Sequence, residues 1–454
     1  RFAAPSRIIE VKFNSLGIEE ASRAANLLGG EIETTKSDLD SLGRPNPVKD
    51  AEGKVLSAHL LKQAIKSDTG AIRSLAQNFH NGLVDMVFIS PEFIGPGIIW
   101  QTKIIYDELE NEVKTETLAY SAGRFLGQVK YSTTLDKGEG KLYKEEVFAT
   151  GARQVYEQDA YSGLINNIEI TALINGQART YRIEREYDQY ESVQSWQMSL
   201  KDNPGLWAVT AQRKAIDKEA KTVSFIQTLA NGHQEDVILD AQTGLTRELG
   251  FEAETAQDLI ASWLTLINYD AQGIEKSRGI YVDKNRDGKI DFIEKKLWVF
   301  LSEKESLDSA NQLAVNRYHK ADGTQGRMSI NVQLGREIGG TVEGIDMGNG
   351  LFEKFGYEIF LSDDLRETGR TTINSLGEIM IRAEEDEFDF STQQSLVRYL
   401  SAWGEEGIAD IDTQSALIRG YDFEDIEVAP GIRDSRRVSI NYTERGIFKD
   451  ASTY

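Results

Sequence analysis

The sequence predicts a β-rich protein of the α+β class, with antiparallel hairpin sheets, helical inserts and more than one domain. The first observation is a change of composition between residues 99 and 250, where Thr and Tyr are frequent and proline is nearly absent. The second is a pair of hairpin-turn signals in that region, Asn175-Gly176 and Asn231-Gly232. The third is helical periodicity of apolar residues outside it. A chain of 454 residues is long enough for roughly two to four domains.

Both turn signals fix a strand register, because a type I′ turn closes a hairpin with two residues of positive φ. Closure at Asn175-Gly176 places Ile168 opposite Ile183 and Ile170 opposite Tyr181, which gathers apolar side chains on one face of the hairpin. Closure at Asn231-Gly232 gives two further expected pairs, Ile226 with Val237 and Phe225 with Ile238.

These patterns divide the chain into four expected domains. They are an α+β N-terminal domain (1–98), a β-rich hairpin domain (99–250), a helical insert (251–326) and an α+β C-terminal domain (327–454). Within the hairpin domain, the turn-punctuated sequences suggest degenerate hairpin repeats of about twenty residues, without a fixed period. Helices are expected over 18–28, 57–79, 252–267 and 391–403, and strands over 7–13 and 83–89.

Composition excludes several classes of function. The net charge of −22 argues against binding to nucleic acid or to an anionic membrane, since both need clustered Lys and Arg. The absence of cysteine excludes disulfides, thiolate nucleophiles and cysteine-ligated metals. No apolar run approaches the ~20 residues of a transmembrane helix. An acidic, cysteine-free chain that begins at Arg1 is typical of an extracellular or cell-surface protein processed from a longer precursor.

In residues 283–294, the spacing of oxygen-bearing groups is typical of a metal-binding loop. From residue 283 to 294, oxygen-bearing groups fall at positions 1, 3, 5, 7, 9 and 12, with a glycine, Gly288, at position 6. Calcium prefers six to eight such oxygens, and glycine permits the sharp turn between them. The expected metal ligands are Asp283, Asn285, Asp287, the Lys289 carbonyl, Asp291 and Glu294.

This loop resembles those of the EF-hand family, and more closely the isolated dockerin-like form. The resemblance covers only residues 283–294 and implies calcium as the cofactor. The preceding segment, with Gly273 and Gly279, does not favour an entering helix, whereas the apolar residues after Asp291 favour a buried exiting helix. An unpaired loop favours a structural ion over a calcium sensor, and a metal-free acidic turn is the third interpretation.

Other candidate sites carry less information. The four histidines (His59, His80, His233 and His319) show no metal-ligand spacing, and the sequence contains no nucleophile elbow. The acidic run at 384–389 is interpreted as a solvated face or a helix N-terminus. Paired carboxylates of a glycosidase cannot be located among 73 Asp and Glu.

The sequence therefore favours a non-enzymatic, calcium-stabilised structural protein of the cell exterior. The expected partners are the calcium ion and further copies of the chain in a filament, layer or shell, with no nucleic acid. A carbohydrate-active enzyme or carbohydrate-binding module, with polysaccharide as partner, is one alternative, and a virion structural protein is the other.

Overall fold

The protein is an all-β molecule built around one antiparallel sheet. The computed structural model describes residues 6–15, 17, 19–26, 31–35, 40, 44, 46–56, 58–136, 140–256, 259–346, 352–389, 394–402, 406–412, 415–429 and 432–453. Over these residues the chain forms strands and one single-turn 3-10 helix, η1 (Glu294–Lys296), and no α-helix. The α+β prediction is therefore wrong, although its β-rich part is confirmed.

Thirty-two strands form the large sheet, and two short strands form a separate hairpin, β4 (Val48–Lys49) with β5 (Val55–Leu56). The strands of the large sheet are β1 (Ser6–Phe13), β2 (Glu19–Asn26), β3 (Glu31–Thr35), β6 (His59–Lys66), β7 (Ile72–Asn78), β8 (Val84–Ile89), β9 (Ile98–Tyr106), β10 (Glu112–Ser121), β11 (Arg124–Asp136), β12 (Lys141–Phe148), β13 (Arg153–Asp159), β14 (Ile165–Ile174), β15 (Gln177–Tyr187), β16 (Val193–Leu200), β17 (Asn203–Asp217), β18 (Thr222–Leu229), β19 (Gln234–Asp240), β20 (Thr246–Ala256), β21 (Leu259–Tyr269), β22 (Glu275–Val282), β23 (Trp298–Asp308), β24 (Leu313–Lys320), β25 (Gln325–Asn331), β26 (Arg336–Asp346), β27 (Phe352–Leu361), β28 (Glu367–Ile373), β29 (Ile379–Asp389), β30 (Gln394–Ser401), β31 (Glu406–Asp412), β32 (Ile418–Ala429), β33 (Ile432–Tyr442) and β34 (Phe448–Thr453).

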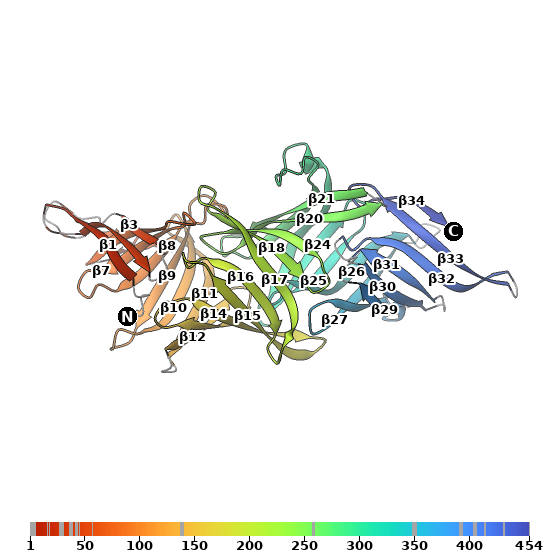
Figure 1. Cartoon of the computed structure of the whole chain (residues 1–454), viewed down its shortest axis with the longest axis horizontal. Helices are drawn as coiled ribbons and strands as arrows, with labels where there is room; N and C mark the ends of the chain where they lie inside the picture. Colours follow the sequence, from red (N-terminus) through yellow and green to blue (C-terminus); the bar gives the residue numbers. More distant parts are fainter. Residues whose placement is uncertain are drawn as a thin grey trace.

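Each strand of the large sheet pairs antiparallel with the next one along the chain, and β3 pairs with β6 across the small hairpin. The sheet winds along the long axis of the molecule, with the first strands at one end and the last at the other (Figure 1). The four-domain division remains a prediction, but its three boundaries fall inside β9, β20 and β25 or at their ends, so one sheet runs through all of them.

The predicted helices are strands. The segment 57–79 forms β6 and β7, 252–267 belongs to β20 and β21, 18–28 is largely β2, and 391–403 contains β30. Residues 18, 27–28, 57, 257–258, 391–393 and 403 lie outside the described part of the chain. In β6 every residue is half-buried, so both faces of the strand contact protein. A strand with apolar residues on both faces lacks the two-residue alternation and can imitate helical spacing.

The two predicted hairpins have different outcomes. At Asn175-Gly176 both residues have positive φ, and Ile168 pairs with Ile183, which confirms the first register. At Asn231-Gly232 the prediction is wrong by one residue, because Phe225 pairs with Val237. There the connection is longer than two residues and is closed by a hydrogen bond from the Leu229 N–H to the His233 carbonyl, 2.9 Å long.

The hairpins form a long internal repeat. A turn of six residues that begins with Asp or Asn recurs at intervals of about 81 residues, with one longer interval of about 91. The first side chain accepts a hydrogen bond from the turn backbone, for example from Ser162 to Asp159 (2.7 Å) and from Thr243 to Asp240 (2.8 Å). The turns begin at Asn78, Asp159, Asp240, Asn331 and Asp412. Each repeat contains six strands.

A Tyr-Asp pair recurs at the same interval. The hydroxyls of Tyr106, Tyr187 and Tyr269 donate to backbone carbonyls 22 or 23 residues earlier, at 2.9, 2.6 and 2.6 Å. Tyr442 makes the corresponding bond to Ile418, although a Thr follows it. Burial raises the pKa of Tyr106 to about 12 and that of Tyr442 to about 12, so both hydroxyls stay protonated donors.

Hydrogen bonds between segments far apart in sequence show that the sheet coils onto itself. Trp100, Tyr181 and Trp263 occupy equivalent positions of successive repeats, in β9, β15 and β21. Each donates a hydrogen bond to the backbone carbonyl of a turn residue 171 to 182 positions later. The acceptors are Ala271, Asp363 and Glu444, at 2.7, 2.9 and 2.9 Å. One coil therefore spans about two repeats, and we call the line of contact between coils the seam.

Glycines allow the backbone to approach closely at the seam. A Cβ atom on Gly70 would lie 2.4 Å from the Lys218 carbonyl oxygen, and one on Gly151 would lie 1.8 Å from that of Ser309. These two glycines are 81 residues apart, so the contact is part of the repeat. Side-chain bonds reinforce it, since Gln333 accepts from the Arg153 N–H (2.7 Å) and donates to the Arg153 carbonyl (2.5 Å).

The largest buried apolar cluster joins strands of two coils. It combines residues of β13 to β18, such as Tyr181, with residues of β27, such as Ile359. The accessible surface of 24420 Å² nevertheless exceeds the about 17,000 Å² expected for a compact protein of this mass. Much of the sheet is therefore not covered by a second layer.

Candidate calcium-binding loop

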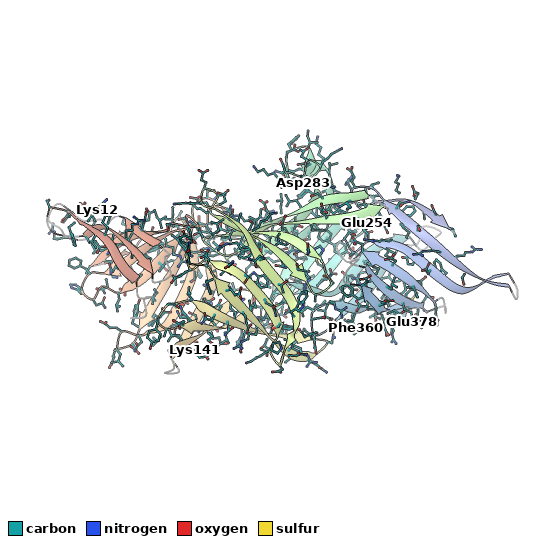
Figure 2. The ribbon with its side chains drawn as sticks, in the orientation of Figure 1. Lys12, Lys141, Glu254, Asp283, Phe360 and Glu378 are labelled. Carbon is teal, nitrogen blue, oxygen red and sulfur yellow. The ribbon has the colours of Figure 1, made fainter. Side chains whose placement is uncertain are left out.

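The predicted calcium loop connects β22 to β23 and projects from the coiled sheet (Figure 1). Figure 2 shows Asp283 at its base. The Val282 N–H donates to the Leu297 carbonyl (3.0 Å) and the Asp283 N–H to the Ser262 carbonyl (2.9 Å), which closes the loop and fixes it to the neighbouring β21. It falls within the one repeat interval of about 91 residues, so it is an insertion of about ten residues into an otherwise regular array.

The exiting helix is reduced to the single turn η1, and the prediction of a buried apolar helix is wrong. Strands enter and leave the loop, in place of the helices of an EF-hand. Leu297 packs at the base, against a cluster that contains Trp263 and Val299. Phe292 and Ile293, which were expected to be buried, are 78% and 69% exposed.

Glu294 organises the ends of the loop. One carboxylate oxygen, Oε1, accepts hydrogen bonds from the backbone N–H groups of Lys284 (2.9 Å) and Asn285 (3.2 Å). The other, Oε2, accepts from the N–H of Asp291 (3.0 Å). The side chain thus links the first and last parts of the loop, and it is only 2% exposed.

Asp283 organises the central turn. Its two carboxylate oxygens accept from the N–H groups of Asp287 (3.3 Å) and Gly288 (2.9 Å), and its side chain is 4% exposed. Gly288 has a φ of 72°, in the left-handed region that glycine enters without steric cost. This is the conformation predicted for the sixth position of the loop.

These two buried carboxylates have no cationic partner among the described residues. Asp240 and Asp412 are buried to the same degree, but each forms an ion pair with an arginine, Arg247 and Arg419. A buried charge is normally paired or bound to a metal, because removing it from water carries a large free-energy penalty. Asp283 and Glu294 therefore leave two negative charges unneutralised at the centre of the loop.

The remaining predicted ligands lie on the outside of the loop. Asn285, Asp287, Lys289 and Asp291 are exposed, and Asp291 accepts from the N–H groups of Ile293 (2.7 Å) and Glu294 (2.8 Å). The described residues contain no group of three or more His, Cys, Asp or Glu already gathered around one point. The structure thus places Asp283 and Glu294 at the centre and does not bring the other ligands to them.

The donor set nevertheless fits a hard divalent cation. Asp283 and Glu294 would hold the ion, with Asn285, Asp287, Asp291 and the Lys289 carbonyl completing an all-oxygen set of the kind that calcium prefers. Charges of both signs lie near the loop, since the Arg286 guanidinium lies 3.6 Å from the Glu252 carboxylate. Burial raises the pKa of the nearby Glu248 carboxyl, and the positive charges of Arg247 and Lys289 oppose that shift.

The other sequence candidates have structural partners. His59 lies 2.7 Å from Asp85, and His233 lies 2.9 Å from Glu235. The acidic run 384–389 lies within β29 and does not precede a helix as expected. Two of its carboxylates form ion pairs with arginines, including Glu385 with Arg366 at 2.8 Å.

Two cavities lie beside seam contacts. The larger, about 550 Å³, is lined by residues such as Tyr131, Arg153 and Gln312. Gln312 bonds the Gly151 carbonyl at 3.1 Å, so part of the lining already joins two coils. The smaller, about 290 Å³, includes Phe93 and Arg247, whose guanidinium lies 4.7 Å from the ring centroid.

Sequence reasoning missed the seam residues. Their signal was present in the regular spacing of Tyr106-Asp107, Tyr187-Asp188 and Tyr269-Asp270, which marks the repeat. The repeating unit contains six strands of unequal length and is about four times as long as the expected hairpin repeat of about twenty residues.

No family model matches the chain, and no curated protein matches it. Among solved structures, a porin-like protein from Bacteroides uniformis aligns at 10% identity over 42% of this chain and 86% of that one, with a TM-score of 0.22. A TcdB2-TccC3-TEV structure aligns at 11% identity over 98% of this chain and 25% of that one, with a TM-score of 0.18. A TcdB2-TccC3-Cdc42 structure aligns at 10% identity, with a TM-score of 0.17. The chain spans about a quarter of these last two proteins, and similarity at this level establishes no function.

Proposed function

We propose that the chain is a calcium-stabilised structural protein of the extracellular space or cell surface. The observation that carries this proposal is the pair of buried, unneutralised carboxylates, Asp283 and Glu294, in a loop inserted once into a regular repeat. Repeat sheets of this kind present extended surfaces, and insertions in them commonly serve binding. Calcium outside cells is abundant enough to occupy even sites with dissociation constants of ~10⁻⁴–10⁻³ M.

Calcium would supply the missing positive charge and cross-link the loop. Glu294 already connects the backbone at Lys284 and Asn285 with that at Asp291, and Asp283 holds the turn at Gly288. Neutralising the two carboxylates removes their mutual repulsion and stabilises this arrangement. Because the base of the loop packs on the cluster around Trp263, the stabilisation extends to β21, β22 and β23.

The test is calcium binding by calorimetry, combined with thermal melting in calcium and in chelator. A site at a hundredfold excess of calcium over its dissociation constant adds about 2.7 kcal/mol to the stability of the folded state. Hydrogen exchange should localise the effect of chelation to β21–β23 and leave the hairpin of β14 and β15 unchanged.

Glu294→Gln removes the negative charge at similar side-chain volume and should abolish calcium binding. Lys289→Ala is the control, since it keeps the backbone carbonyl and should bind calcium as the wild type does. Wild-type protein that takes up no calcium at millimolar concentration, and melts identically with chelator, would show that the loop is only an acidic turn.

A further inference from the structure

The tip of the inserted loop carries an unusual pair of side chains. Phe292 and Ile293 are adjacent, large, apolar and mostly exposed, while the next apolar residue, Leu297, is half-buried at the base of the loop. The Lys296 ammonium lies 5.1 Å from the centroid of the Phe292 ring. The loop that carries this pair projects from the sheet (Figure 1).

The net charge of the loop is also opposite in sign to that of the whole chain. The whole chain carries −22, whereas residues 283–296 contain five basic and four acidic side chains. All five basic side chains are exposed, and two of the four carboxylates are the buried Asp283 and Glu294. A bound calcium ion would add two further positive charges. The basic residues are Lys284, Arg286, Lys289, Lys295 and Lys296.

We propose that the calcium-loaded loop docks the protein on an anionic lipid surface, with Phe292 and Ile293 inserted among the acyl chains and the lysines facing the headgroups. This inference rests on the proposed calcium site. Apolar side chains at the centre of a cationic patch match the chemistry of an anionic lipid–water interface. Apolar side chains that are mostly exposed on a projecting loop suit insertion into a planar lipid surface better than the enclosure of a small ligand, which needs a concave pocket.

Calcium has two effects in this proposal. It raises the positive charge of the tip, and by binding the Glu294 carboxylate, next to Ile293, it reinforces the link that Glu294 already makes to the backbone of Lys284 and Asn285. The acidic body of the protein is repelled by an anionic membrane, so only an element that projects beyond it can make contact. The insertion of about ten residues supplies that projection.

The experiment is co-sedimentation of the full chain with vesicles of phosphatidylserine and phosphatidylcholine, or of phosphatidylcholine alone, in calcium or in chelator. We expect binding only to the mixed vesicles in calcium. The double variant Phe292→Ser with Ile293→Ser should weaken binding by about tenfold or more while its calcium binding, measured by calorimetry, stays unchanged. Lys295→Gln with Lys296→Gln should weaken binding to the mixed vesicles and reduce its salt dependence.

The matched control is Leu376→Ser, which removes an 81% exposed apolar side chain from the equivalent turn of the next repeat, between β28 and β29. It should bind vesicles as the wild type does. Calcium binding without vesicle binding would overturn the docking proposal alone, and absence of calcium binding would overturn the proposed calcium site as well. If the Phe292→Ser, Ile293→Ser variant still binds vesicles, calcium bridges the lipid to the acidic body of the protein. If the protein self-associates through Phe292 and Ile293 and does not bind vesicles, these residues contact a second copy of the chain. Either result contradicts lipid docking by Phe292 and Ile293.

Discussion

Replacement of Gly151 by alanine should open the seam between two coils. Gly151 has a φ of 84°, and an added Cβ would lie 1.8 Å from the Ser309 carbonyl oxygen. The left-handed conformation alone costs an L-residue about 1–2 kcal/mol. Relief of the clash requires the turn at Ser309 to move by more than an ångström, since an ordinary contact of a Cβ atom begins at 3.4 Å.

That movement would break two hydrogen bonds across the seam, from Ser309 Oγ to the Ala149 carbonyl (3.0 Å) and from Gln312 Nε2 to the Gly151 carbonyl (3.1 Å). Each bond contributes about 0.5–1.5 kcal/mol, so we expect Gly151→Ala to destabilise by a total of about 2–5 kcal/mol. The assay is urea denaturation followed by circular dichroism, with small-angle scattering to detect expansion of the coil.

Gly377→Ala is the matched control, because Gly377 has a φ of 83° and no atom lies within 4 Å of its added Cβ. It should lose only the backbone contribution of about 1–2 kcal/mol and keep the wild-type scattering profile. Equal destabilisation by the two substitutions, with no expansion in either, would refute the seam as a stabilising contact.

Three further predictions concern the seam, acid stability and assembly. Trp263→Phe deletes the indole N–H that donates to the Glu444 carbonyl and should cost about 1 kcal/mol, measured by urea denaturation, with faster hydrogen exchange in the turn between β33 and β34. The hydrogen bond from the Ser162 N–H lowers the pKa of the Asp159 carboxyl, so the ionised Asp159 side chain stabilises the fold above about pH 4, and this stabilisation is lost as the pH falls through the folded-state pKa. Asp159→Asn should therefore lower the melting temperature at pH 7 but not at pH 2. An equal loss at both pH values would contradict this. Because the chain carries −22, light scattering should increase as calcium or ~0.15 M salt shortens the screening length to about 8 Å, and a flat titration would exclude charge-regulated self-assembly.

The loop at residues 283–294 separates what spacing within a short segment can predict from what it cannot. Its turn at Gly288 has the left-handed conformation that the twelve-residue pattern predicts, since this feature depends on contacts within the loop itself. Calcium binding by the six expected ligands remains a prediction. The expected exit helix does not form, because the segment after η1 continues as β23, which pairs with its neighbours β22 and β24 in the sheet. The exposure of Phe292 and Ile293 follows from the same pairing, which leaves the tip outside the sheet.

The sequence by itself determined the β-rich character, the register of the Asn175-Gly176 hairpin and which oxygen-bearing side chains the loop carries. Each depends on residues within about twenty positions of one another, where turn geometry and side-chain chemistry are sufficient. Only the tertiary structure decided that the apparent helices are strands, that six strands form the repeating unit and that Trp100, Tyr181 and Trp263 join successive coils. The seam arises from hydrogen bonds between segments up to 182 residues apart, about which local periodicity carries no information. The apparent helices are strands because each pairs with its neighbours in the sheet, where apolar residues on both faces of a strand can imitate helical spacing.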